Sequence, residues 1–255
     1  MSPTGRKIHE AVLKRAGLST PVAIGILETP TGFEVNAIHG WPERMQKFFE
    51  TSLQNFKPMV TRIRAWRRDG ELSTNNPVIT DAILKQDYLY CGAGSPGYTI
   101  AHLHKTLAYK KLLKIHQEGA VLCFGSATAV AVSRWALPVY EIFKTGADLR
   151  WLDGLDFFGV YGLRLVIVPH WNNAEGEDFD TTRCWMGKDR FEKLKAMLPP
   201  DAVIVGIDEQ TACVVDVTKE VMEVVGIGQA HIIKIKGKRG KDFDTGASFS
   251  FSALL

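Results

Sequence analysis

Ser126 lies where an apolar stretch gives way to small residues, a position from which a serine can act as a nucleophile. The stretch from Ala120 to Val132 predicts a strand up to Phe124, a break at Gly125 and a helix after the serine. Such a strand-to-helix turn exposes a hydroxyl at the carboxyl edge of a sheet, beside the N–H groups that begin the helix. Those N–H groups favour negative charge, as an acyl-transfer site requires.

Two other apolar strands end on side chains that could complete this chemistry. The run 163–170 ends on His170, and the run 202–209 ends on Glu209. A serine needs a base to take its proton, and the base needs a carboxylate to fix its tautomer and stabilise its cation. His170 is the candidate base. The candidate acids are Glu209 and Glu141, and the sequence does not choose between them.

Acyl transfer also requires hydrogen-bond donors where charge develops on the carbonyl oxygen. The N–H of Ala127 and those of the loop 92–94, with Gly94 foremost, are the natural set. Glycines let the backbone approach a substrate closely. The alternative for this loop is an ordinary strand-to-helix turn with no catalytic role.

The elements that must position these residues alternate between strand and helix, which predicts an α/β fold with a mostly parallel sheet covered by helices. We expect a helix over 42–56 with Pro42 in its first turn, and one long helix over 98–117. The run 137–143 is expected to be extended, and the polar run 171–184 to be a loop that covers a site or moves. After Val203 the pattern becomes short strands, typical of a hairpin-rich edge.

Length and composition bound the possible functions. We expect one domain over residues 1–255, since 255 residues with 45% hydrophobic content can bury a full core. The charge of +3, from 31 basic and 28 acidic residues, gives no field that implies nucleic acid. The cysteines are widely spaced and no segment is apolar enough to span a membrane, so we expect a cytoplasmic protein with no metal and no cofactor. Homodimerisation stays open.

The segment 169–176 (PHWNNAEG), with Arg190 on a following helix, resembles the region of the catalytic histidine in the alpha-aspartyl dipeptidase and cyanophycinase family of serine peptidases. That family has the class I glutamine amidotransferase-like fold, a three-layer sandwich around a mostly parallel sheet. Its nucleophile motif, Gly-x-Ser-Ala-Gly, is similar to residues 124–128 (FGSAT), and its glycine-rich loop to residues 92–95. The dipeptidase branch has an acidic residue near the position of Glu141, and the cyanophycinase branch a glutamate in the context of Glu209.

The resemblance implies cleavage of a small peptide or amide substrate, with Ser95, Asn172 and Arg190 as substrate contacts. For Arg190 the alternative is a surface ion pair. The likeness covers roughly half of the chain. A closer match is a set of uncharacterised amidotransferase-like proteins, through the runs 28–33 (ETPTGF) and 137–142 (LPVYEI).

Two departures from the motif keep a second interpretation open. Phe124 and Thr128 replace glycines two places before and two places after the nucleophile. Bulkier side chains there would narrow the pocket or alter the turn. The alternative function is therefore a non-catalytic relative that keeps the pocket to bind a small molecule or a partner.

Overall fold

The structure is a computed structural model that describes residues 2–237 and 239–255. Contacts divide these residues into two compact units, one of residues 9–128 and the other of residues 129–255 together with 2–8. Each unit has its own sheets and its own buried side chains. The expectation of a single domain stays a prediction.

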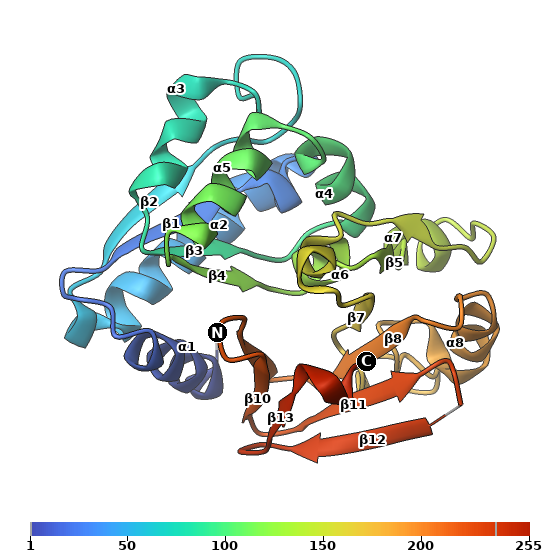
Figure 1. Ribbon diagram of the computed structural model, residues 1–255. Helices are drawn as coiled ribbons and strands as arrows, with labels where there is room; N and C mark the ends of the chain where they lie inside the picture. The colour runs from blue at the N-terminus through green and yellow to red at the C-terminus, as the bar shows by residue number, and fades with distance from the viewer. Residues whose placement is uncertain (1, 238) are drawn as a thin grey trace. The chain divides into compact units, whose positions relative to one another are not determined.

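A parallel sheet with the strand order β2-β1-β3-β4 forms the centre of the first unit (Figure 1). Leu27 of β1 pairs with Ile63 and with Cys91, and Cys91 pairs with Phe124, so the four strands end in register at one edge. Loops that follow different strands are thereby gathered at that edge. The strands are β1 (Ala23–Leu27), β2 (Met59–Ile63), β3 (Tyr88–Cys91) and β4 (Val121–Phe124).

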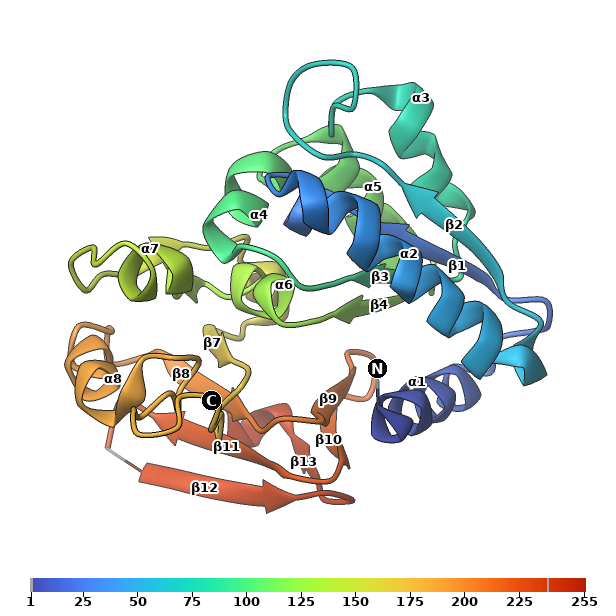
Figure 2. The same cartoon turned by 180° about the vertical axis from the view of Figure 1, so that it is seen from behind.

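Helices cover both faces of this sheet, with α2 on one face and α5 on the other (Figures 1 and 2). The face under α2 is closed by a cluster that includes Met45, Phe49 and Leu53 at helical spacing, packed on Ile24 and Tyr88. The helices of this part of the chain are α1 (Pro3–Arg15), α2 (Val35–Ser52), α3 (Pro77–Thr80), α4 (Pro96–Leu103), α5 (Leu107–Gln117) and α6 (Ala127–Ala131), with 3-10 turns η1 (Thr29–Thr31), η2 (Gln54–Phe56) and η3 (Asp81–Lys85).

Two helix predictions in the first unit were wrong in their bounds. The helix predicted to begin at Pro42 begins at Val35, because Glu34 caps it by accepting from the N–H of Asn36 at 3.0 Å. Pro42 therefore lies inside α2. The long helix predicted over 98–117 is two helices, since Thr106 caps a new one by accepting from the N–H of Tyr109.

The second unit combines a parallel strand pair with antiparallel hairpins. In the sheet β12-β11-β8-β7 the pair β7 and β8 is parallel and the others are antiparallel, and β13-β10-β9 is an antiparallel sheet. The remaining elements are β5 (Trp135–Ala136), α7 (Val139–Phe143), β6 (Leu152–Asp153), η4 (Phe157–Tyr161), β7 (Leu165–Val168), α8 (Gly187–Ala196), β8 (Val203–Ile207), β9 (Thr211–Asp216), β10 (Val221–Gly226), β11 (Gln229–Lys234), β12 (Arg239–Asp244), β13 (Ser248–Ser250) and η5 (Phe251–Ala253).

The α/β class, the parallel sheet flanked by helices and the hairpin-rich C-terminal part are confirmed. The run 137–143 was predicted to be extended, and this was wrong for its second half. Residues Val139–Phe143 form α7, whose Val139 and Ile142 lie three apart and are both buried, so packing decides the conformation. Within the described ranges, the helices are all too short or too polar to cross a membrane.

Candidate functional site

Ser126 stands on the turn between β4 and α6, as the sequence predicted. Its φ of 48° is in the left-handed region, which a residue with a side chain rarely occupies. The turn is closed by backbone hydrogen bonds, from the N–H of Gly125 to Cys91 O at 2.8 Å and from the N–H of Thr128 to Gly125 O at 3.0 Å. Strain of this kind, about 1–3 kcal/mol, is typical of functional turns. Ala127 follows as the first residue of α6, where N–H groups have no partner within the helix.

The glycine-rich loop lies against this turn. Thr128 is buried, and its hydroxyl donates to Gly92 O at 2.9 Å. This threonine therefore ties the Ser126 turn to the loop after β3. Because both loops follow strands that end in register, Ser126, Ala127 and Gly94 belong to one edge of the first unit.

Close packing fixes the path of the loop itself. Gly94 has a φ of 146°, and a Cβ placed there would lie 1.8 Å from Pro30 O. The neighbouring Ser95 donates its N–H to that same Pro30 O at 3.1 Å. The Ser95 hydroxyl accepts from the N–H of Tyr98 at 3.2 Å and so caps α4. Only glycine fits the central position of this loop.

In the second unit the end of β7 meets the end of β8. His170 follows β7 by two residues, and its Nδ1 lies 2.8 Å from Oε1 of Glu209. The side-chain amide of Asn173 donates to the same Oε1 at 3.1 Å, and the N–H of Glu209 donates to Oδ1 of Asn172 at 2.8 Å. Of the two candidate acids, Glu209 is thus the one that hydrogen-bonds to His170.

These contacts favour the ionised form of the carboxylate. The hydrogen bond from His170 lowers the pKa of Glu209, as do the charge of His170 and the amide of Asn173, while partial burial acts in the opposite direction. A carboxylate at Nδ1 holds the proton on that nitrogen, and the basic lone pair is then on Nε2. The pair has the chemistry of an oriented general base.

The loop over residues 183–185 supports His170 from another side. Arg183, Cys184 and Trp185 all have φ between 58° and 64°, and the N–H of Cys184 donates to His170 O at 3.1 Å. The ring of Trp185 packs on the imidazole at 4.8 Å between centroids. Arg190, from α8, donates to the carbonyl of Trp185 at 3.0 Å and to that of Met186 at 2.7 Å. Arg190 therefore braces this loop.

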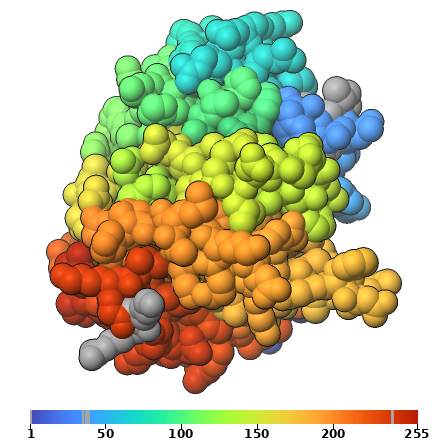
Figure 3. Space-filling view, turned by 90° about the vertical axis from the view of Figure 1, so that its right-hand side faces the viewer, coloured from blue at the N-terminus to red at the C-terminus, as the bar shows by residue number. Residues whose placement is uncertain are grey.

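The rest of the loop after His170 extends outward. Asn173 and Thr181 are buried at its base, whereas residues 177–180 are exposed and the segment, gold in Figure 3, projects from its unit. Phe179 near the tip is 82% exposed.

Neither the cysteines nor a metal site offers a second reactive centre among the described residues. Burial raises the pKa of Cys184, and the charge of Glu209 adds to this, so its thiol stays protonated at neutral pH. Burial also raises the pKa of Cys91, Cys123 and Cys213. Among residues 2–237 and 239–255 there is no group of three side chains arranged to hold a metal ion.

The structure gathers the predicted residues in two sets. Ser126, Ala127, Gly94 and Ser95 belong to the edge of the first unit, whereas His170, Glu209, Asn172, Arg190 and Glu141 belong to the second unit. Glu141 lies in α7, and its Oε2 is buried with no hydrogen-bond partner within the described residues.

Sequence reasoning missed Asn173, Trp185 and the role of Thr128. Asn173 hydrogen-bonds to the side chain of Glu209, and the preceding Asn172 to its backbone N–H. The two asparagines are adjacent, and the sequence does not indicate which of them makes which bond. Trp185 reaches His170 through three successive left-handed residues, for which the sequence holds no signal.

Comparison with known proteins identifies the fold. The sequence matches no protein-family model, and no curated protein matches it significantly. A solved structure of a peptidase from an acI-B1 Actinobacterium superposes with a TM-score of 0.75 at 20% identity, covering 98% of this chain and 92% of that one. The two proteins share a fold. A candidate peptidase E protein from Listeria monocytogenes EGD-e gives a TM-score of 0.49 at 15% identity, over 92% of this chain and 93% of that one.

Proposed function

We propose that the protein is a serine hydrolase that cleaves a peptide or amide bond in a small substrate. The observation that carries this proposal is the hydrogen bond between Nδ1 of His170 and Glu209, reinforced by Asn173. The left-handed Ser126 on its strand-to-helix turn supports it, as does the fold shared with a peptidase. In the proposal Ser126 is the nucleophile, His170 the base and Glu209 the residue that orients the base.

In the first step the Ser126 hydroxyl attacks the substrate carbonyl carbon and passes its proton to Nε2 of His170. The imidazolium is stabilised by the Glu209 carboxylate. The N–H groups of Ala127 and Gly94 stabilise the oxyanion, a contribution typically worth about 3–4 kcal/mol for each donor. The C–N bond then breaks and the amine leaves with the proton from His170. Water, deprotonated by His170, hydrolyses the acyl-enzyme and regenerates the Ser126 hydroxyl.

The threonine that departs from the family motif does not argue against catalysis. Its side chain is buried and its hydroxyl donates to Gly92 O, so it helps to hold the turn in shape. The same contact supports a fixed distance between the two proposed oxyanion donors.

A fluorophosphonate probe, which reacts with activated serines, tests the proposal. We expect the wild-type protein to be labelled and Ser126→Ala not to be labelled. Ser248→Ala is the control, because it removes an exposed serine of β13 in the second unit and should leave labelling in place. Labelling that survives in Ser126→Ala, with mass spectrometry locating the adduct elsewhere, would refute Ser126 as the nucleophile.

Substrate class is tested with a panel of dipeptides and simple amides. We expect turnover of at least one class by wild type and none by Ser126→Ala. A wild-type protein that is neither labelled nor active on the panel, yet binds panel members, would instead support the binding protein considered as the alternative.

A further inference from the structure

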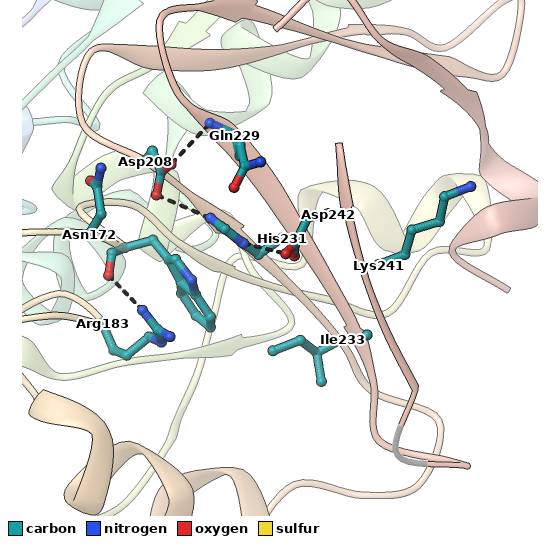
Figure 4. A pocket seen from close by; sticks show the side chains of 10 residues that line it. Asn172, Arg183, Asp208, Gln229, His231, Ile233, Lys241 and Asp242 are labelled. Carbon is teal, nitrogen blue, oxygen red and sulfur yellow. Dashed lines mark hydrogen bonds and ion pairs between the residues drawn. The ribbon is translucent and has the colours of Figure 1, made fainter. Parts of the chain in front are cut away.

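A cavity of about 600 Å³ lies in the second unit, lined from β11, β12 and the segments that follow β7 and β8 (Figure 4). Its lining includes Trp171, Asn172 and Asp208 but neither His170 nor Glu209. Its volume falls within the roughly 300–1,000 Å³ of small-molecule sites. The proposed reaction makes no use of it.

The back of the cavity is rigidly built. His231 has Nε2 at 3.1 Å from Asp208 and Nδ1 at 2.9 Å from Asp242, so both ring nitrogens meet a carboxylate. The Trp171 ring is held between His231, stacked at 5.4 Å, and the guanidinium of Arg183 at 3.8 Å. Asp208 also accepts from the N–H of Gln229 at 3.0 Å. A lining fixed in this way loses little entropy when a ligand binds.

One side of the cavity presents donors that are not used. Arg183 donates one hydrogen bond from Nη1 to Trp171 O, and Oδ1 of Asn172 accepts from the N–H of Glu209. For Nε and Nη2 of Arg183 and Nδ2 of Asn172, the described part of the chain offers no partner. In Figure 4 these two side chains lie together at the left. A guanidinium beside an amide is a typical carboxylate-binding pair.

The other side presents acceptors. Asp242 uses Oδ1 for His231, and Gln229 uses its side-chain N–H for Asp244 at 2.7 Å. Oδ2 of Asp242 and Oε1 of Gln229 then have no partner within residues 2–237 and 239–255. Figure 4 shows both residues to the right of Asn172 and Arg183. These oxygens suit an ammonium group.

We propose that this cavity binds a small zwitterion of the α-amino acid type, with its carboxylate on Arg183 and Asn172 and its ammonium on Asp242 and Gln229. A dianion would face the carboxylates of Asp208 and Asp242, and a dication would face Arg183 and Lys241, so a ligand with one charge of each sign fits best. Ile233 in the lining supplies an apolar contact for a side chain. The inference is independent of the proposed hydrolase activity.

Calorimetry on the full-length protein tests this with three related compounds. We expect L-leucine to bind, and leucinamide, which lacks the carboxylate, and N-acetyl-L-leucine, which lacks the ammonium, to bind at least 10-fold more weakly. Equal affinity for all three, or no binding of L-leucine at millimolar concentration, would overturn the proposal.

Variants locate the site. Asp242→Asn removes a charge from a side chain that is 62% exposed, so the fold should persist, and L-leucine should bind at least 10-fold more weakly. Arg183→Gln should have the same effect. Lys236→Gln is the control, since Lys236 is an exposed cation of the same unit and does not line the cavity. L-leucine affinity unchanged in Asp242→Asn, with a wild-type melting temperature, would place binding elsewhere and refute the assignment.

Discussion

The Ser126 turn and the His170–Glu209 pair are held in place by different kinds of interaction. The turn is fixed by the backbone: Gly125 and Thr128 close it, and Gly94 packs against Pro30 O with no room for a side chain. The pair is fixed by side chains, through hydrogen bonds of Glu209 with His170 and Asn173. Substitutions that disturb the packing of the turn should therefore act first on folding, and substitutions in the pair should act mainly on reactivity.

Gly94→Ala should have the largest effect. The new methyl group would lie 1.8 Å from Pro30 O at a φ of 146°, so the backbone of two loops must move. We expect a loss on the order of 5 kcal/mol of unfolding free energy, as for the most damaging substitutions, measured in urea or seen as failure to fold. Gly70→Ala is the control, with a φ of 89° but no heavy atom within 4 Å of the new Cβ. It should cost about 1 kcal/mol. Similar stabilities for the two variants would contradict a steric origin.

Glu209→Gln tests the other side of the comparison. A neutral amide cannot stabilise the imidazolium, so the second-order rate of fluorophosphonate labelling should fall roughly 10²- to 10⁴-fold. The melting temperature should change little, because the side chain is 39% exposed. Glu141→Gln is the matched control and should leave the labelling rate near that of wild type. A larger loss in Glu141→Gln than in Glu209→Gln would reverse the assignment of the acid.

Histidine has different surroundings in the two units: His170 hydrogen-bonds to the carboxylate of Glu209, whereas His9 is packed among aromatic rings. This difference gives a pH test. His9 is buried among aromatic rings with Nδ1 at 2.7 Å from the Tyr88 hydroxyl, and burial lowers its pKa to about 4. The unfolded chain binds a proton at this site below about pH 6.5 and the folded protein does not, so stability is full above pH 6.5 and falls as the pH drops toward 4. Between pH 7 and pH 5 the loss from His9 should be about 2 kcal/mol.

The measurement is the unfolding free energy at both pH values for wild type and His9→Asn, whose amide can still bond to Tyr88. The difference between pH 7 and pH 5 should shrink by about 2 kcal/mol in the variant. An equal pH dependence in both proteins would show that His9 is not the group responsible.

Strand ends could be predicted from the sequence because they depend on local patterns. Ser126, His170 and Glu209 each follow a strand, and an apolar run in the sequence predicts each of these strands. The pattern could not reveal which carboxylate reaches His170, since that depends on β7 and β8 pairing in parallel with Val168 opposite Gly206. Local rules also failed where packing competes with propensity.

Pro42 and α7 are two such failures. Pro42 was expected to start a helix, but the Glu34 cap starts it earlier and the helix continues through the proline. In α7 the burial of Val139 and Ile142 outweighs the strand preference of a run rich in branched and aromatic residues. Neither outcome is visible without knowing what the segment packs against.

Thr128 offers the smallest and most specific test, because its hydroxyl ties the Ser126 turn to the loop after β3. Thr128→Val keeps the shape but leaves Gly92 O without its 2.9 Å donor, and should cost about 1–2 kcal/mol. Thr128→Ser keeps the donor and loses a buried methyl, at about 1 kcal/mol. Labelling of Ser126 separates the two: it should slow in Thr128→Val, where the loop that carries Gly94 is released, and stay near wild type in Thr128→Ser. Equal labelling rates in both variants would mean that the turn keeps its geometry without this hydrogen bond.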